Sequence, residues 1–492
     1  MGIVKRQSIK SAVYVYLGVG LGYLTRAKLF PEYLTEAEIG VLALLVTYAS
    51  IFAQIATLGF NQAVIKHFPI FRHEEKKHHG FLSIQLALAL VGFLIIWIAF
   101  PVLEVLILDF RPSPILEEYF HLTLILTFVI LLFNVVDTYN VVLFNSTTGI
   151  FLREFALKVL MLVAFIPLIY AKINFDRYAV YYVCGYALIA FLLIMYTLAS
   201  GQLHLKPNFQ LFDRDLVRKM VSISLFGLIM GFGNIAIISI DNIMINWYFD
   251  EAATGIYATN FLFAILVLMP SRGVNRIAPA VISDAFNDNR LQDIKELQSK
   301  SSLNQLIVSL FIFMGLAINM ENIYQILPAS YRAGYWVILF IGLANIIKMG
   351  GGVSTAVIGF SDHYKFNTYF MALLLGLLIM TNILFIPIYG IMGAALASLV
   401  SVTIFEAVKF MFLKFKYGIQ PYSLRHLKAI MVAVTAGGIV YFIPVINPFL
   451  IDILVRGAVF SLLFIPAIYY LYISEDINKI IDNLAGFLKG KN

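Results

Sequence analysis

Long apolar segments, separated by short polar connectors, occupy most of this sequence. A helix that crosses a membrane needs about 20 apolar residues. Only 13% of the residues are charged, whereas soluble domains carry roughly 25%. The sequence therefore predicts an all-α polytopic membrane protein. We place fourteen transmembrane helices at 9–30, 39–63, 80–107, 119–143, 153–171, 178–200, 219–246, 254–280, 301–319, 333–353, 365–387, 389–412, 427–444 and 452–473.

A short pattern recurs 215 residues further along the chain, where Thr35–Gly40 (TEAEIG) returns as Asp250–Gly255 (DEAATG). Each copy lies between two predicted helices, and an internal repeat of this kind is typical of membrane proteins built from two lobes. Six predicted helices separate the copies, and because six is even, we expect the two lobes to run parallel. We interpret the repeat itself as a tight turn that closes at Gly40 and Gly255.

This repeat predicts a definite organisation of the chain. The N-lobe, with the first six helices, spans 1–200, and the C-lobe, with the next six, spans 220–412. A cytoplasmic connector at 201–219 joins them. The last two membrane helices lie in 413–473. An amphipathic cytoplasmic tail at 474–492 follows, since its apolar residues recur at helical spacing.

Basic residues are distributed unequally between the two sides of the predicted helices. With the N-terminus inside, 28 of the 35 lysines and arginines fall on the inner side and 7 on the outer side. Short cytoplasmic loops carry such an excess of Lys and Arg. We therefore expect both termini to be cytoplasmic and attribute the net charge of +7 to membrane topology rather than to nucleic-acid binding.

Motifs of catalysis and cofactor binding are missing from the sequence. It contains no GxxxxGK[ST] phosphate loop, no HExxH and no GxSxG. Its single cysteine, Cys184, lies in an apolar segment, and the histidines at 67, 73, 78 and 79 fit a solvated loop better than a metal site. We expect no enzymatic activity, no cofactor and no metal.

Ionisable side chains within membrane helices are costly and are therefore candidates for function. Four basic ones stand out: Arg26 in the first helix, Arg272 and Arg276 on one face of the eighth, and Lys348 before three glycines in the tenth. Each has a simpler interpretation as well, because a basic residue near a helix end reaches the interface or anchors the helix there.

Acidic residues within the helices are fewer. Asp137 in the fourth helix and Asp241 in the seventh are candidates for ion coupling, and Asp137 also fits a polar contact between helices. Glu406 has Lys409 three residues on, so we expect a local ion pair there. Basic candidates outnumber acidic ones around the repeated pattern. This excess favours an anionic ligand, above all phosphate, which arginine binds through paired hydrogen bonds.

Three stretches, taken in their order along the chain, resemble one family. They run from Arg26 to Leu58-Gly59-Phe60, from Asp241-Asn-Ile-Met-Ile-Asn246 to Gly255-Ile-Tyr257, and over Ile386-Pro-Ile-Tyr-Gly-Ile-Met-Gly-Ala-Ala395. The sequence is similar to the polysaccharide biosynthesis transporters, the O-antigen and capsule repeat-unit flippases of the multidrug/oligosaccharidyl-lipid/polysaccharide exporter superfamily. The resemblance extends over nearly the whole chain, although each motif alone is loose.

The resemblance implies a flippase in the bacterial cytoplasmic (inner) membrane that acts in O-antigen or lipopolysaccharide synthesis. Its substrate would be an oligosaccharide repeat unit on undecaprenyl pyrophosphate, turned from the inner to the outer leaflet by alternating access. Membrane lipids, a polysaccharide polymerase and glycosyltransferases would be its partners. Helices one, two, seven and eight would line a cationic cavity holding Arg26, Arg272 and Arg276. We add Lys348 to these candidates only because a charged side chain within a membrane helix is costly, and not because of the resemblance.

Two other functions stay open from the sequence. The first is an ion-coupled multidrug or cation antiporter of the same superfamily, with Asp241 or Asp137 as the coupling carboxylate. The first helix contains no carboxylate, which weighs against a proton-coupled drug exporter of this kind. The second is a membrane scaffold that organises polysaccharide-assembly enzymes without transporting anything.

Overall fold

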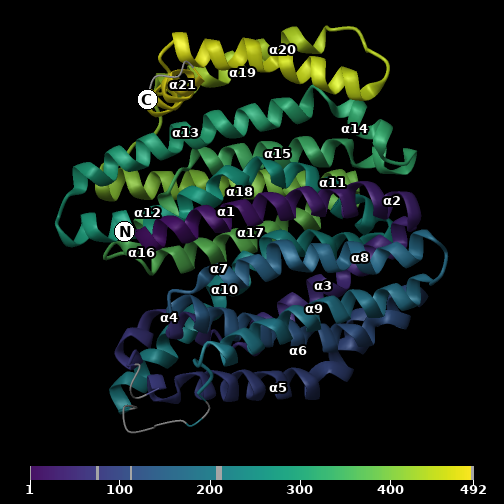
Figure 1. Cartoon of the computed structure of the whole chain (residues 1–492), viewed down its shortest axis with the longest axis vertical. Coiled ribbons are helices and arrows are strands. Elements are labelled where there is room, and N and C mark those ends of the chain that lie inside the picture. The colour runs from purple at the N-terminus through teal and green to yellow at the C-terminus, as the bar shows by residue number, and fades with distance from the viewer. Residues whose placement is uncertain (1, 74–76, 111–112, 205, 207–212, 489–492) are drawn as a thin grey trace. The chain divides into compact units, whose positions relative to one another are not determined.

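The structure, a computed structural model, describes residues 2–73, 77–110, 113–204, 206 and 213–488. All regular secondary structure in these residues is helical, and they contain no strand (Figure 1). The predicted all-α membrane fold is thereby confirmed. The chain forms two compact units, Met1–Ala258 and Thr259–Asn492.

The first unit contains ten α-helices, three short segments of other helical type and the beginning of α11, as far as the described residues go. Its elements are α1 (Gly2–Tyr23), η1 (Leu24–Leu29, a π-helix), α2 (Phe30–Tyr33), α3 (Glu36–Ala56), α4 (Phe60–Phe71), η2 (Lys77–Gly80), α5 (Phe81–Phe110), α6 (Pro114–Val142), α7 (Ser146–Ile150), η3 (Phe151–Ala156, a π-helix), α8 (Leu157–Ile169), α9 (Phe175–Ala199), α10 (Arg214–Tyr248) and α11 (Glu251–Ile265).

The second unit begins within α11 and continues to the C-terminal helix (Figure 1). Its further elements are η5 (Leu266–Leu268), α12 (Met269–Asn287), α13 (Leu291–Ala317), α14 (Met320–Ile326), η6 (Ala329–Gly334), α15 (Tyr335–Gly350), α16 (Ser354–Phe360), α17 (Phe366–Tyr389), α18 (Ile391–Tyr417), α19 (Leu424–Tyr441), α20 (Phe449–Tyr470) and α21 (Glu475–Leu488).

Twelve helices in the described residues are long and apolar enough to cross a membrane. The two other predicted helices, at 9–30 and 153–171, correspond to helical stretches that π-helical turns interrupt, η1 in the first and η3 in the second. Residues 205 and 207–212 of the predicted connector at 201–219 lie outside the described residues, and 214–219 already belong to α10. The division into two six-helix lobes and a C-terminal pair stays a prediction.

The repeated pattern does not form a tight turn, and this prediction is wrong. Gly40 lies inside α3 and Gly255 inside α11, and neither has a positive φ. A Cβ atom at Gly40 would come within 1.8 Å of the Glu251 carbonyl oxygen, and one at Gly255 within 2.0 Å of the Glu36 carbonyl oxygen. The two copies therefore pack reciprocally against each other, and glycine is needed there because the helix backbones touch.

Gly390, by contrast, does make a turn. It is the single residue between α17 and α18 and has a φ of +62°, a conformation that glycine adopts at little cost. Three residues later, a Cβ at Gly393 would lie 2.1 Å from the carbonyl oxygen of Phe385. These two glycines allow α17 and α18 to pack directly against each other.

Two buried ion pairs stabilise the second unit. Lys409 Nζ lies 2.9 Å from Glu406 Oε1 on α18, with both side chains 4% exposed, which confirms the predicted local pair. On α20, Arg456 Nε donates to Asp452 Oδ2 at 2.6 Å, and its other nitrogens donate to the carbonyl oxygens of Val440 and Ile443. This second pair therefore ties α20 to the C-terminal end of α19.

We expect the substitution Arg456→Ala to lower the free energy of unfolding by about 3–5 kcal/mol, because it leaves the buried Asp452 carboxylate without a cation and with only the N–H donors of Asn322 and Ile446. Equilibrium unfolding of the purified protein in detergent measures this change.

The matched control is Arg332→Ala, which removes the exposed ion pair between Arg332 and Glu321 in the same unit. Exposed pairs contribute about 0–1 kcal/mol. Equal losses of stability in the two variants would contradict the structural role of Arg456.

Candidate functional site

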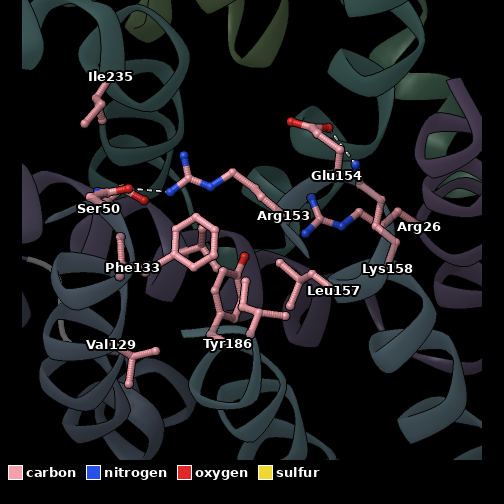
Figure 2. Close-up of a pocket in the computed structure, with 14 residues that line it drawn as sticks. Arg26, Ser50, Val129, Phe133, Arg153, Glu154, Leu157, Lys158, Tyr186 and Ile235 are labelled. Atoms are coloured by element: carbon pink, nitrogen blue, oxygen red, sulfur yellow. Dashed lines mark hydrogen bonds and ion pairs between the residues drawn. The ribbon is translucent and has the colours of Figure 1, made fainter. Parts of the chain in front are cut away.

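A cavity of about 330 Å³ lies within the first unit. Its wall combines apolar side chains with a group of charged and polar ones (Figure 2). The residues that line it are Arg26, Val46, Ser50, Val129, Ile130, Phe133, Asn134, Arg153, Glu154, Leu157, Lys158, Tyr186, Ile189 and Ile235.

Arg26 enters the cavity wall from η1. Its Nη2 atom donates a hydrogen bond of 3.0 Å to the hydroxyl of Tyr182 on α9. Tyr178, Tyr182 and Tyr186 are spaced four residues apart and so share one face of α9, and the ring centroids of Tyr182 and Tyr186 are 5.6 Å apart. Among the described residues, no acidic side chain forms an ion pair with Arg26. A neutral tyrosine thus orients this guanidinium without cancelling its charge.

Arg153 comes from η3 and is held in a similar way. Its Nη2 atom donates a hydrogen bond to Asn134 Oδ1 on α6, and its guanidinium carbon lies 4.7 Å from the centre of the Phe133 ring. Figure 2 shows the Arg153 side chain extended beside this ring. An amide oxygen and an aromatic face are both neutral partners. Arg153 also keeps its charge.

Lys158 follows one turn after Glu154, and its Nζ lies 3.0 Å from Glu154 Oε2. Both side chains are about a quarter exposed, at 24% and 26%. The lining of the cavity thus contains three basic side chains and one acidic side chain. Its excess of positive charge suits an anion, and two guanidinium groups can each bind a phosphate through paired hydrogen bonds.

Both cavity arginines lie on π-helical turns, Arg26 on η1 and Arg153 on η3. Such turns are rare and are frequent at functional sites, because the extra residue turns a side chain out of the regular helical register. Arg153 and Lys158 were not predicted as site residues, because basic residues near the inner end of a membrane helix also fit the rule for topology. Their position within the predicted membrane helix 153–171 could have marked them as candidates, because ionisable side chains in such helices are costly.

The other predicted basic residues belong to the second unit. Arg272 and Arg276 lie on α12, and their side chains are outside the described part of the structure. Lys348 lies in the last turn of α15 and is exposed. The helix ends at Gly350, two residues later, and Gln298 and Ser302 donate to the carbonyl oxygens of Gly351 and Gly350. The roles of Arg272, Arg276 and Lys348 stay predictions.

Of the two acidic candidates, Asp241 is 1% exposed and accepts a hydrogen bond of 2.6 Å from the hydroxyl of Tyr257. Asp137 is half-buried on α6, one turn beyond Asn134. Their roles in ion coupling also stay predictions. In the described residues there is no group of three or more His, Cys, Asp or Glu side chains that could hold a metal ion.

Comparison with known proteins identifies one family. Residues 4–283, more than half of the chain, match the family model described as polysaccharide biosynthesis protein. Among curated proteins, no sequence relative matches the chain.

Solved structures share the fold at low sequence identity. A lipid II flippase, MurJ, in an inward closed conformation has a TM-score of 0.70 and 15% identity, and the match covers 94% of this chain and 100% of MurJ. An inward-facing multidrug resistance MATE transporter of the MOP superfamily has a TM-score of 0.63 and 12% identity, with 83% of this chain and 94% of that chain covered.

A third similar structure is that of a MOP superfamily transporter from Pyrococcus furiosus, in which reverse polarity of the binding pocket suggests a different function. Its TM-score is 0.57 at 12% identity, and the match covers 84% of this chain and 96% of that chain. At identities of 12–15%, these three similarities show that the chain shares the fold of these proteins.

We expect Tyr182→Phe to weaken binding of inorganic pyrophosphate roughly three- to tenfold, since the hydrogen bond that orients Arg26 is worth about 0.5–1.5 kcal/mol. Isothermal titration calorimetry of the protein in lipid nanodiscs measures this. Tyr181→Phe is the matched control, because Tyr181 is the preceding residue on α9 and is exposed. Equal affinities for all three proteins would rule out this role of Tyr182.

Proposed function

The chain belongs to the polysaccharide biosynthesis protein family, and we propose that it is a flippase for a lipid-linked oligosaccharide. In this proposal it moves a repeat unit carried on polyprenyl pyrophosphate from the inner to the outer leaflet by alternating access. It does so in the cytoplasmic membrane of a bacterium, in O-antigen or lipopolysaccharide synthesis.

The observation that carries the proposal is the charge of the cavity in the first unit. Arg26 and Arg153 are held there by neutral partners. An isolated ion costs of the order of tens of kcal/mol to transfer from water into hydrocarbon. Two fixed guanidinium groups that form no ion pair within the described residues supply what a diphosphate needs to lower that cost. They would repel a cationic substrate and would offer a neutral one only ordinary hydrogen bonds.

Each part of the substrate has a matching environment in this proposal. The diphosphate binds Arg26 and Arg153, and Lys158 reaches it if its pair with Glu154 opens. Arg272, Arg276 and Lys348 stay candidates for binding the substrate from the sequence, apart from this cavity. The sugars occupy hydrated space, whereas the polyprenyl chain stays in the bilayer. A likeness to a protein described as a lipid II flippase supports a substrate that carries a lipid.

The bound lipid-linked oligosaccharide would come from glycosyltransferases on the inner side and pass to a polysaccharide polymerase on the outer side. These enzymes are therefore the proposed partners. The protein itself would change the position of its substrate without making or breaking a covalent bond.

We expect Arg26→Ala and Arg153→Ala each to reduce translocation at least tenfold, because each removes a charge-assisted contact worth roughly 1.5–3 kcal/mol. Proteoliposomes loaded with an undecaprenyl-pyrophosphate-linked oligosaccharide report translocation as the fraction that an external glycosidase can reach. Arg177→Ala, at an exposed arginine in the first turn of α9, is the matched control.

Wild-type translocation by both cavity variants would contradict the assignment of the site. The corresponding substitutions Arg272→Ala and Arg276→Ala test the second group of basic residues in the same assay. Export of cationic dyes that fails in Asp241→Asn, without any transfer of the oligosaccharide, would instead identify an antiporter.

A further inference from the structure

A half-buried carboxylate lies close to the cavity residue Asn134. Asp137 is three residues beyond Asn134 on α6, so the two side chains share one face of that helix. Asn134 lines the cavity and accepts the hydrogen bond from Arg153. The Oδ1 atom of Asp137 is shielded from solvent and has no hydrogen-bond partner in the described residues. A polar atom in this state is costly unless a proton or a donor reaches it.

α7, which continues directly into η3 and so into Arg153, lies against Asp137. A Cβ atom at Gly149 on α7 would lie only 1.7 Å from Asp137 Oδ1, so the carboxylate touches the backbone there. Gly149 precedes Arg153 by four residues, which is about one helical turn. One face of α6, with Asn134 and Asp137, therefore meets one face of α7 and η3, with Gly149 and Arg153.

Several other charged groups lie on the helices around α6. From α4, Arg72 donates a hydrogen bond to the carbonyl oxygen of Val142. His67 on the same helix is buried beside Lys66 and Lys219, which lowers its pKa. The charged residues of α3, α5 and α9 lie in the turns nearest the other end of α6. α7 contains no charged residue. Arg153 binds Asn134, one turn away on the same face of α6, and is therefore placed to respond to a change in the charge of Asp137.

We propose that Asp137 binds a proton and thereby controls whether Arg153 is available to the anion in the cavity. With the proton on Oδ1, Asp137 is neutral and Arg153 stays with Asn134, as in this structure. When the proton leaves to water, the carboxylate attracts Arg153 by one turn along α6 and withdraws its charge from the bound anion. Binding of the proton then increases the affinity of the protein for the anion, and binding of the anion increases its affinity for the proton by the same factor. This inference rests on the proposed function, because it assigns the anion to this cavity.

Asp137→Asn mimics the protonated carboxyl group and keeps its shape. Binding of inorganic pyrophosphate in nanodiscs is compared between this variant and the wild type at each pH, so that the titration of the ligand itself cancels in the ratio. We expect equal affinities at acidic pH. The variant should bind about tenfold more tightly at alkaline pH, within the usual range of coupling between two sites. Glu118→Gln, the same change at an exposed residue of α6, should follow the wild type throughout.

Infrared titration tests the proton itself without any ligand. The wild type should show the band of a protonated carboxyl group that disappears in Asp137→Asn and persists in Glu118→Gln. Arg153→Gln should move the midpoint of that band to higher pH, since it removes the cation that favours the carboxylate.

The two measurements distinguish the possible failures. Absence of the band, or a ratio of affinities that does not change with pH, would overturn the role of Asp137. If pyrophosphate binds at no pH, the anion site of the proposed function is wrong. The infrared band and its response to Arg153→Gln then still decide whether Asp137 exchanges a proton under the control of Arg153.

Discussion

A charge inside a membrane protein must be neutralised by a partner or reached by water, because hydrocarbon solvates it so poorly. The described residues meet this requirement in two ways. In the second unit, Glu406 pairs with Lys409 and Asp452 with Arg456, all four nearly inaccessible to solvent. In the first unit, Arg26 and Arg153 face a cavity instead. The buried ion pairs of the second unit neutralise their own charges and hold helices together. In the first unit, the charges of Arg26 and Arg153 face the cavity, where a ligand could neutralise them.

Backbone geometry makes that open arrangement possible. Each cavity arginine lies on a π-helical turn, and each is oriented by a neutral group, a tyrosine hydroxyl for Arg26 and an asparagine amide for Arg153. An acidic partner at either position would hold the side chain equally well but would remove the charge. The neutral partners therefore position the guanidinium groups in advance without lowering their affinity for phosphate.

The sequence predicted the helical membrane fold because long apolar segments are a strong and local signal, and it predicted the pair of Glu406 and Lys409 from helical spacing alone. It also singled out Arg26 in the first predicted helix as a candidate, and Arg26 lines the cavity. It missed Arg153, since a basic residue at the start of an inner segment has an ordinary explanation in topology. The tight turn assigned to Gly40 and Gly255 was wrong, because sequence does not distinguish a glycine that turns the chain from one that lets two helices touch.

The most direct test of the account is native mass spectrometry of the protein released from membranes that contain undecaprenyl-pyrophosphate-linked oligosaccharide. The account predicts that the wild type retains one such lipid. It also predicts that the double variant Arg26→Ala/Arg153→Ala loses that lipid while still inserting normally. Retention of the lipid by the double variant at the wild-type level would contradict the central claim that these two arginines bind the substrate.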